Sequence, residues 1–179
     1  MMDPDAPNRK LNEMLTSRAI EATAMLGARW AVIHPGTILD YPDDRAKNQQ
    51  ANVDYFTPHL EHAKRFGVRL SMENMCGKRY CTTAEELCKL VDAFNDEDMV
   101  ACWDFGHANL MGCDQVASLR ILGDRLKTLH VADNTGVKDD HIAPFLGTIA
   151  WEEVMRTLVE IGYSGDFTYE IHGIADRVP

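Results

Sequence analysis

The sequence lacks any long apolar stretch. No run within its 179 residues approaches the length of a membrane-spanning helix, and the N-terminus MMDPDAPNRK has no apolar core of the kind found in signal peptides. We therefore expect a cytoplasmic protein with no membrane segment. Hydrophobic residues make up 45% of the chain and charged residues 26%, which is typical of a globular domain. Because no low-complexity linker interrupts the sequence, we expect a single domain over residues 1–179.

Basic residues and paired cysteines are also scarce. Lys and Arg number 18 against 28 Asp and Glu, which gives a net charge of −10. An acidic protein repels phosphate backbones unless its basic residues gather on one face, and here they are scattered, so nucleic acid is a disfavoured partner. The five cysteines form no CxxC pair, which argues against a zinc ribbon or a disulfide framework and favours reduced, mostly packed thiols.

What the sequence does contain is a regular alternation of helices and strands. Apolar spacing predicts helices within the first 27 residues, over 48–66, behind a capping box of Thr83 and Glu86, over 114–122 and over 151–161. Short apolar runs predict strands at WAVIHPG, GVRLSMEN, MVACWD, LKTLHVAD and FTYEIH, with a sixth near His141. Such alternation favours parallel strands joined by right-handed crossovers, in an open sheet or a barrel.

Most of these strands end on a residue type that binds metal ions. The strand ends carry His34, Glu73, Asp104 with His107, His130 with Asp133, and Glu170, and the loop KDDHIAPFLG adds Asp139, Asp140 and His141. Parallel strands bring their C-terminal ends to one rim, where crowded carboxylates repel one another. A divalent cation removes that conflict, since Asp, Glu and neutral His are its usual ligands. The pattern therefore predicts a metal centre.

Each residue also has a purely structural interpretation. A single His at a strand end is more often a hydrogen-bonded structural residue, Asp104 could cap the following turn, and Asp133 in ADN suits a turn as well as a metal site. His59 and His62 have charged neighbours on a helix, so we expect them to be solvated, whereas His172 fits either interpretation. The repetition of the pattern at five separate strand ends favours the functional interpretation.

In chain order, the motifs IHPG, MEN, DFGH, LHVAD, DDH…LGTIAW and GYSGDFTYEI resemble the xylose-isomerase-like TIM barrel superfamily. This superfamily includes sugar-phosphate isomerases and epimerases and metal-dependent apurinic endonucleases. The resemblance extends over roughly residues 10–171 and implies an α/β fold of the (β/α) barrel type. Complete barrels have eight strands and about 250 residues. We therefore expect an incomplete barrel without the first two strands and the last helix, and its open edges favour homo-oligomers.

In the isomerase and epimerase branch, the resemblance implies one divalent ion (Mn, Mg, Co or Zn) bound by Glu73, Asp104, His130 and Glu170. Glu73 and Glu170 would also be the catalytic acid and base, and His107 would face the substrate. The implied substrate is a small sugar or sugar phosphate. The implied reaction removes a proton next to a carbonyl and proceeds through a metal-stabilised enediolate.

Two other functions remain open. In the endonuclease branch the resemblance implies further zinc ligands, which match His34, His107, Asp139 and His141, and hydrolysis of abasic DNA. An early His of that pattern has no counterpart here, and the acidic composition opposes the interpretation. A truncated, non-catalytic relic that keeps the ligands but binds only a polyol or another protein is the third interpretation.

Overall fold

Five strands alternate with helices in the computed structural model, which describes residues 6–36 and 44–172. All five pair in parallel, in the order β1-β2-β3-β4-β5. Each strand therefore lies beside the next one in the chain, which is the winding of a TIM barrel and not of a doubly wound sheet. The strands are β1 (Trp30–Ile33), β2 (Arg69–Glu73), β3 (Met99–Asp104), β4 (Leu126–Val131) and β5 (Asp166–Tyr169).

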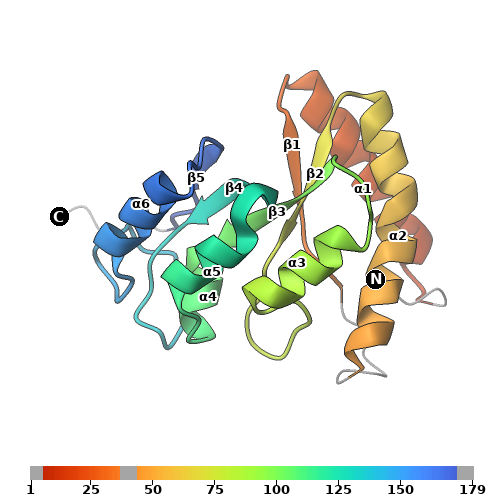
Figure 1. The fold of residues 1–179 in the computed structure, drawn as a ribbon. Coiled ribbons are helices and arrows are strands. Elements are labelled where there is room, and N and C mark those ends of the chain that lie inside the picture. The colour runs from red at the N-terminus through yellow and green to blue at the C-terminus, as the bar shows by residue number, and fades with distance from the viewer. Residues whose placement is uncertain (1–5, 37–43, 173–179) are drawn as a thin grey trace.

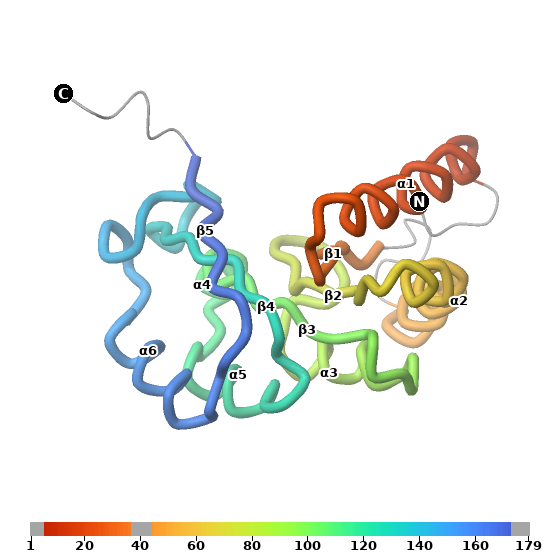
Figure 2. Tube along the Cα trace, turned by 90° about the horizontal axis from the view of Figure 1, so that it is seen from above, coloured from red at the N-terminus to blue at the C-terminus, as the bar shows by residue number. Residues whose placement is uncertain are grey.

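Helix α1 precedes β1, and the other helices connect successive strands (Figure 1). Seen from above in Figure 2, the strands follow an arc with α3, α5 and α6 along its outer side. The expected incomplete barrel is confirmed, since five parallel strands form an open half-barrel. The helices are α1 (Arg9–Met25), α2 (Arg45–Arg65), α3 (Ala84–Asp92), α4 (Phe105–Leu110), α5 (Gln115–Leu122) and α6 (Trp151–Glu160), and a 3-10 turn η1 (Gly123–Arg125) precedes β4.

Side-chain caps start four of these helices. Asp44, Thr83, Asp104 and Asp114 each accept a hydrogen bond from a backbone N–H in the first turn of α2, α3, α4 and α5. Of the two hydrogen bonds in the capping box predicted at Thr83, one is confirmed, from the backbone N–H of Glu86 to the Thr83 hydroxyl. The Glu86 carboxylate accepts from the backbone N–H of Thr82 and not of Thr83, so it holds the residue before the cap.

β3 separates the hydrophobic core from the functional rim. Every residue of β3 is buried, and successive side chains point to opposite faces of the sheet. Met99, Ala101 and Trp103 belong to the core cluster beneath the outer helices, where Trp103 donates to Gln115. Cys102 and Asp104 alternate with them and therefore point to the concave face of the half-barrel.

Three expectations differ from the structure. The proposed sixth strand near His141 is wrong, because the described residues there form only an isolated antiparallel bridge between Asp133 and Ile142. Helix α4 is too short to show a periodic pattern and was not expected. His59 is buried and not solvated, because α1 covers it and places the Ser17 hydroxyl 3.4 Å from its Nδ1.

Helix α1 buries Ile20 in the core, directs polar residues toward α2 and leaves most of its larger apolar residues exposed. Thr16 and Ser17 lie within hydrogen-bond distance of Tyr55 and His59 on α2. The outward side carries a stripe of exposed apolar residues, which we call the α1 stripe: Leu11, Met14, Leu15, Met25 and Leu26. The helical spacing of the sequence predicted this helix correctly, but Leu11 and Leu15 of that pattern lie on the exposed side, whereas Ile20 is buried. No helix in the described part of the chain is long and apolar enough to span a membrane.

Candidate metal centre

Four side chains converge at the concave rim, each from a different strand. Glu73 and Asp104 are the last residues of β2 and β3, His130 is the penultimate residue of β4, and Glu170 directly follows β5. One donor atom of each residue lies within 4.8 Å of the donor atoms of the other three. The parallel register explains the convergence, since Asp104 is the partner of His130 and Glu73 is the partner of Cys102.

Glu73 is the hub of this cluster. Its carboxylate is only 1% exposed, and its oxygens lie 3.1 Å from His34 Nε2, 3.3 Å from His107 Nδ1 and 3.3 Å from His130 Nδ1. Burial alone would raise the pKa of Glu73, but the imidazoles of His107, His130 and His34 around the carboxylate outweigh burial and hold the pKa far below its ordinary value. Glu73 is therefore an ionised carboxylate in a buried site.

Asp104 uses one oxygen to start a helix and leaves the other free. Its Oδ1 accepts the backbone N–H of His107 at 2.6 Å and caps α4. Its Oδ2 is buried and has no hydrogen-bond partner among the described residues, and the same holds for His130 Nδ1, 3.9 Å away. Burial raises the pKa of Asp104 to about 6, although the nearby His107 opposes it.

These two unpartnered atoms test whether a cation fits the cluster. A buried polar atom without a partner is costly unless an ion or water satisfies it. Here a carboxylate oxygen and an imidazole nitrogen face the same cluster, together with Glu73 and with Glu170 Oε2, which lies 3.1 Å from His130 Nδ1. Three carboxylates and one imidazole form a donor set that divalent cations accept, so these residues fit such an ion.

A second group adjoins the cluster. The Asp139 Oδ2 atom lies 3.5 Å from His107 Nε2 and 3.3 Å from His141 Nε2. The Nδ1 of His107 donates to the backbone oxygen of Asn74 at 2.9 Å, and the Nδ1 of His141 donates to that of Glu170 at 2.8 Å. Both rings thus hold a proton on Nδ1 and turn Nε2 toward one carboxylate, an orientation that favours metal ligation.

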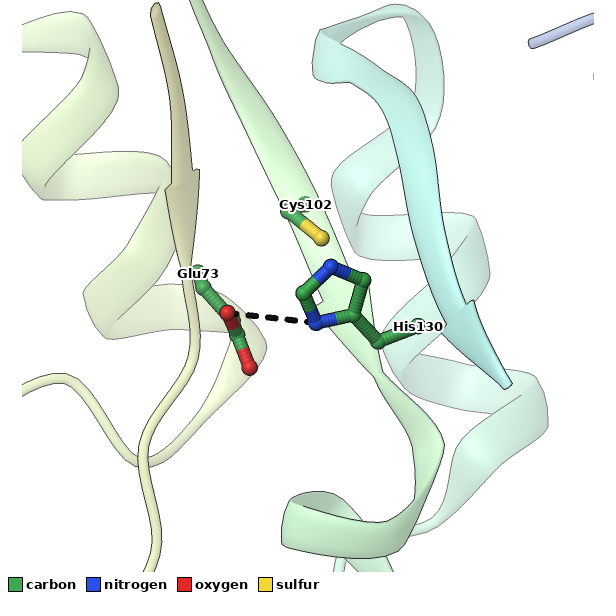
Figure 3. A group of neighbouring side chains, drawn as sticks. All are labelled: Glu73, Cys102 and His130. Carbon is green, nitrogen blue, oxygen red and sulfur yellow. Dashed lines mark ion pairs between the residues drawn. The ribbon is translucent and has the colours of Figure 1, made fainter. Parts of the chain in front are cut away.

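Three further residues lie near the site, two cysteines that the sequence predicts to be core residues and His172, for which the sequence leaves both interpretations open. Cys102 approaches Glu73 and His130 (Figure 3), Cys76 approaches His107 and Asp139, and His172 stacks on His141 with ring centroids 4.2 Å apart. Because the cysteines were interpreted as core, their positions were overlooked. The signal was present for Cys102, which lies two residues before Asp104 on the same strand and therefore on the same face.

Asp133, by contrast, has a structural role. It is fully buried, and its carboxylate accepts hydrogen bonds from the backbone N–H groups of Asn134, Phe145 and Ile149 and from the indole N–H of Trp151. A carboxylate that accepts four hydrogen bonds has little capacity left for a metal ion. Of the two interpretations given by the sequence, the structure favours the turn-forming one.

Comparisons with known proteins agree with this geometry. A family model described as xylose isomerase-like TIM barrel matches residues 1–177. The chain is 31% identical to the uncharacterized protein MJ1311 of Methanocaldococcus jannaschii over 178 residues, which cover 95% of this chain and 60% of that protein. It is 29% identical over 151 residues to a probable endonuclease 4 of Bacillus licheniformis, covering 74% of this chain and 49% of that protein.

Among solved structures, the crystal structure of a D-tagatose 3-epimerase-like protein matches with a TM-score of 0.87 and 25% identity. That match covers 98% of this chain and 67% of the other. The chain thus spans 60% and 49% of the lengths of the two curated relatives named above. The strand order, the concave rim of metal-binding residue types and the match over residues 1–177 lead to one conclusion: the chain belongs to the xylose isomerase-like TIM barrel family.

Proposed function

We propose that this protein is a metal-dependent isomerase or epimerase of a small sugar or sugar phosphate. The observation that carries the proposal is the convergence of Glu73, Asp104, His130 and Glu170, whose donor atoms lie within 4.8 Å of one another. The likeness to a D-tagatose 3-epimerase-like protein supports a sugar as the substrate class. The four residues would hold one divalent ion (Mn, Mg, Co or Zn), which supplies Lewis-acid polarisation of a carbonyl group when bound.

The two glutamates are the proposed proton carriers. Glu73 lies buried inside the cluster, with its carboxylate 3.3 Å from His130 Nδ1, and a carboxylate in that position can act as the base toward a carbon next to a carbonyl. Glu170 comes from β5, and its side chain is 37% exposed, so a substrate that enters from solvent can reach it. Because the two carboxylates come from β2 and β5, one can remove a proton and the other can return it. His107 is the proposed hydrogen-bond partner of a substrate hydroxyl.

Glutamine substitutions test this assignment. Glu73→Gln and Glu170→Gln each keep the side-chain volume and remove the base, so we expect turnover of ketohexoses such as D-tagatose and D-fructose to fall by about 10²-fold or more. Circular dichroism should report an intact fold. The matched control is Glu160→Gln on α6, whose partner is Arg120, and it should retain full turnover.

Two outcomes would contradict the proposal. Unchanged turnover in both glutamine variants would remove these residues from the mechanism. Stoichiometric metal binding without turnover of any keto-sugar by the wild-type protein would favour the non-catalytic alternative.

A specific observation supports a second candidate, an endonuclease IV-like zinc phosphodiesterase acting on abasic DNA. His107, Asp139 and His141 form a donor group beside the four-residue cluster, and the exposed His34 contacts Glu73, so more than one ion can be accommodated. The similarity to a probable endonuclease 4 is consistent with it. The net charge of −10 argues against a DNA substrate.

The number of bound ions separates the two candidates. Elemental analysis of the protein saturated with Zn²⁺ should give one ion per chain for the isomerase and two or three for the nuclease. We expect one ion, and Asp139→Asn should leave that count unchanged because Asp139 lies outside the four-residue cluster. Two or more ions in the wild-type protein, reduced by Asp139→Asn, together with cleavage of abasic DNA, would establish the nuclease instead.

A further inference from the structure

Cys102 adjoins the proposed metal centre, and none of the roles given above uses it. Its Sγ atom, a carboxylate oxygen of Glu73 and a ring nitrogen of His130 all lie within 4.8 Å of one another. Figure 3 shows the sulfur beside the His130 ring, next to the nitrogen that does not face Glu73. The two nitrogens of this ring therefore have different surroundings, with carboxylates near one and a thiol near the other.

The backbone of β3 directs this thiol toward the cluster. Cys102 is fully buried and lies opposite Glu73 on β2 and Thr128 on β4. The pairing of β3 with β4 shifts register between Ala101 and Cys102. Such irregularities re-aim side chains next to functional sites. Two residues later on the same face, Asp104 Oδ2 is buried and has no hydrogen-bond partner within the described ranges.

The chemistry of a ligating imidazole explains why a neighbour is needed on its far side. A neutral ring that offers one nitrogen to a cation carries its proton on the other, and the partner of that N–H fixes the tautomer and the ring orientation. In His130 the nitrogen that faces the carboxylates is Nδ1, at 3.1 Å from Glu170 and 3.3 Å from Glu73. The proton then belongs on Nε2, where the sulfur can accept it weakly.

We propose that Cys102 is a positioning residue of the metal centre: its Sγ atom accepts the Nε2–H group of His130 in the ion-bound protein, so that the Nδ1 lone pair faces the cation. The inference rests on the metal centre proposed above and not on the sugar chemistry. It assigns Cys102 a role that a packed core thiol does not have.

Two variants and a control test the inference. Cys102→Ala removes the acceptor, and Cys102→Ser replaces the sulfur with a hydroxyl that can accept the same N–H group. Cys88→Ala is the matched control, because Cys88 is a buried thiol whose partner is the Ile121 backbone oxygen, in the layer of outer helices. The measurements are Zn²⁺ affinity by calorimetry and the His130 tautomer from ¹⁵N NMR of the Zn²⁺-loaded protein.

We expect the wild-type protein to carry the His130 proton on Nε2. Cys102→Ala should weaken Zn²⁺ binding about tenfold, the lower end for loss of a partner behind a ligating His. Cys102→Ser should recover most of that loss, and Cys88→Ala should change neither measurement.

A proton on Nδ1 of His130 in the Zn²⁺-loaded wild type would overturn the inference, and so would unchanged affinity and tautomer in Cys102→Ala. If Cys102→Ala does not fold, the wild-type tautomer and the Cys102→Ser affinity decide the question. Failure of the proposed function is distinguishable, since a protein that binds Zn²⁺ with the expected tautomer but turns over no sugar contradicts the isomerase alone.

Discussion

At the scale of single residues, two aspartates at neighbouring strand ends have opposite roles. Asp133 follows β4 and accepts hydrogen bonds from four groups, so its carboxylate holds the following loop together. Asp104 ends β3 and leaves one buried oxygen without a partner in the described part of the chain. The difference between a structural and a ligating carboxylate therefore lies in the number of N–H groups around it, and not in its position at a strand end.

Substitution of Asp133 should reveal its structural role. In Asp133→Asn, the amide NH₂ group replaces an oxygen that accepts from Phe145 N and Trp151 Nε1, so buried donors face a donor. We expect the free energy of unfolding to fall by about 3 kcal/mol. Urea denaturation measures the change, with the exposed Asp54→Asn as the control. A loss equal to that of the control would show that Asp133 has no such structural role.

The sequence alone could not separate these two aspartates. Both follow apolar runs, and the periodicity of each strand predicts only that the carboxylate lies at the rim. The partners of Asp133 come from the loop that ends at Trp151, where Phe145 adopts a positive φ of 71°. An irregular loop has no repeating pattern from which such contacts could be inferred. The convergence of Glu73, Asp104 and His130 was predictable because it follows from parallel strand order.

At the scale of elements, α1 and β1 form an open end of the half-barrel. β1 is the first strand of the sheet order and pairs only with β2 within the described sheet, and β5 is the last. The α1 stripe adds exposed apolar side chains at the β1 end, including Met25 and Leu26 at 88% and 84% exposure. Apolar patches beside an unpaired strand are a surface on which another copy of the chain can associate.

We therefore expect the protein to self-associate and the α1 stripe to contribute. In Leu15→Glu, a charge replaces an exposed apolar side chain, so the mass measured by light scattering should shift toward the 20.1 kDa of one chain. The free energy of unfolding should change by no more than about 0.5 kcal/mol, as for other surface positions. Val137→Glu, at an exposed position in the loop after β4, is the control. A wild-type chain that is monomeric at all concentrations would refute the expectation.

At the scale of the whole molecule, the centre depends on long-range order. Its four residues come from four successive strands, with a helix between each pair of strands, so no local segment contains more than one of them. Contacts between residues so far apart in sequence form slowly, because loop closure costs entropy before the strands pair. The hub carboxylate of Glu73 is surrounded by histidines from three other segments, and it gains all three only when β1 to β4 have paired.

This dependence has a consequence for how the protein matures. As the chain leaves the ribosome, β2 emerges well before the residue that follows β5, so a nascent chain exposes an unfinished set of donors until Glu170 has emerged. Tight ion uptake then becomes available only after that point. Occupancy by the ion would mark a chain in which β2 to β5 have assembled, which the amount of helix alone would not reveal.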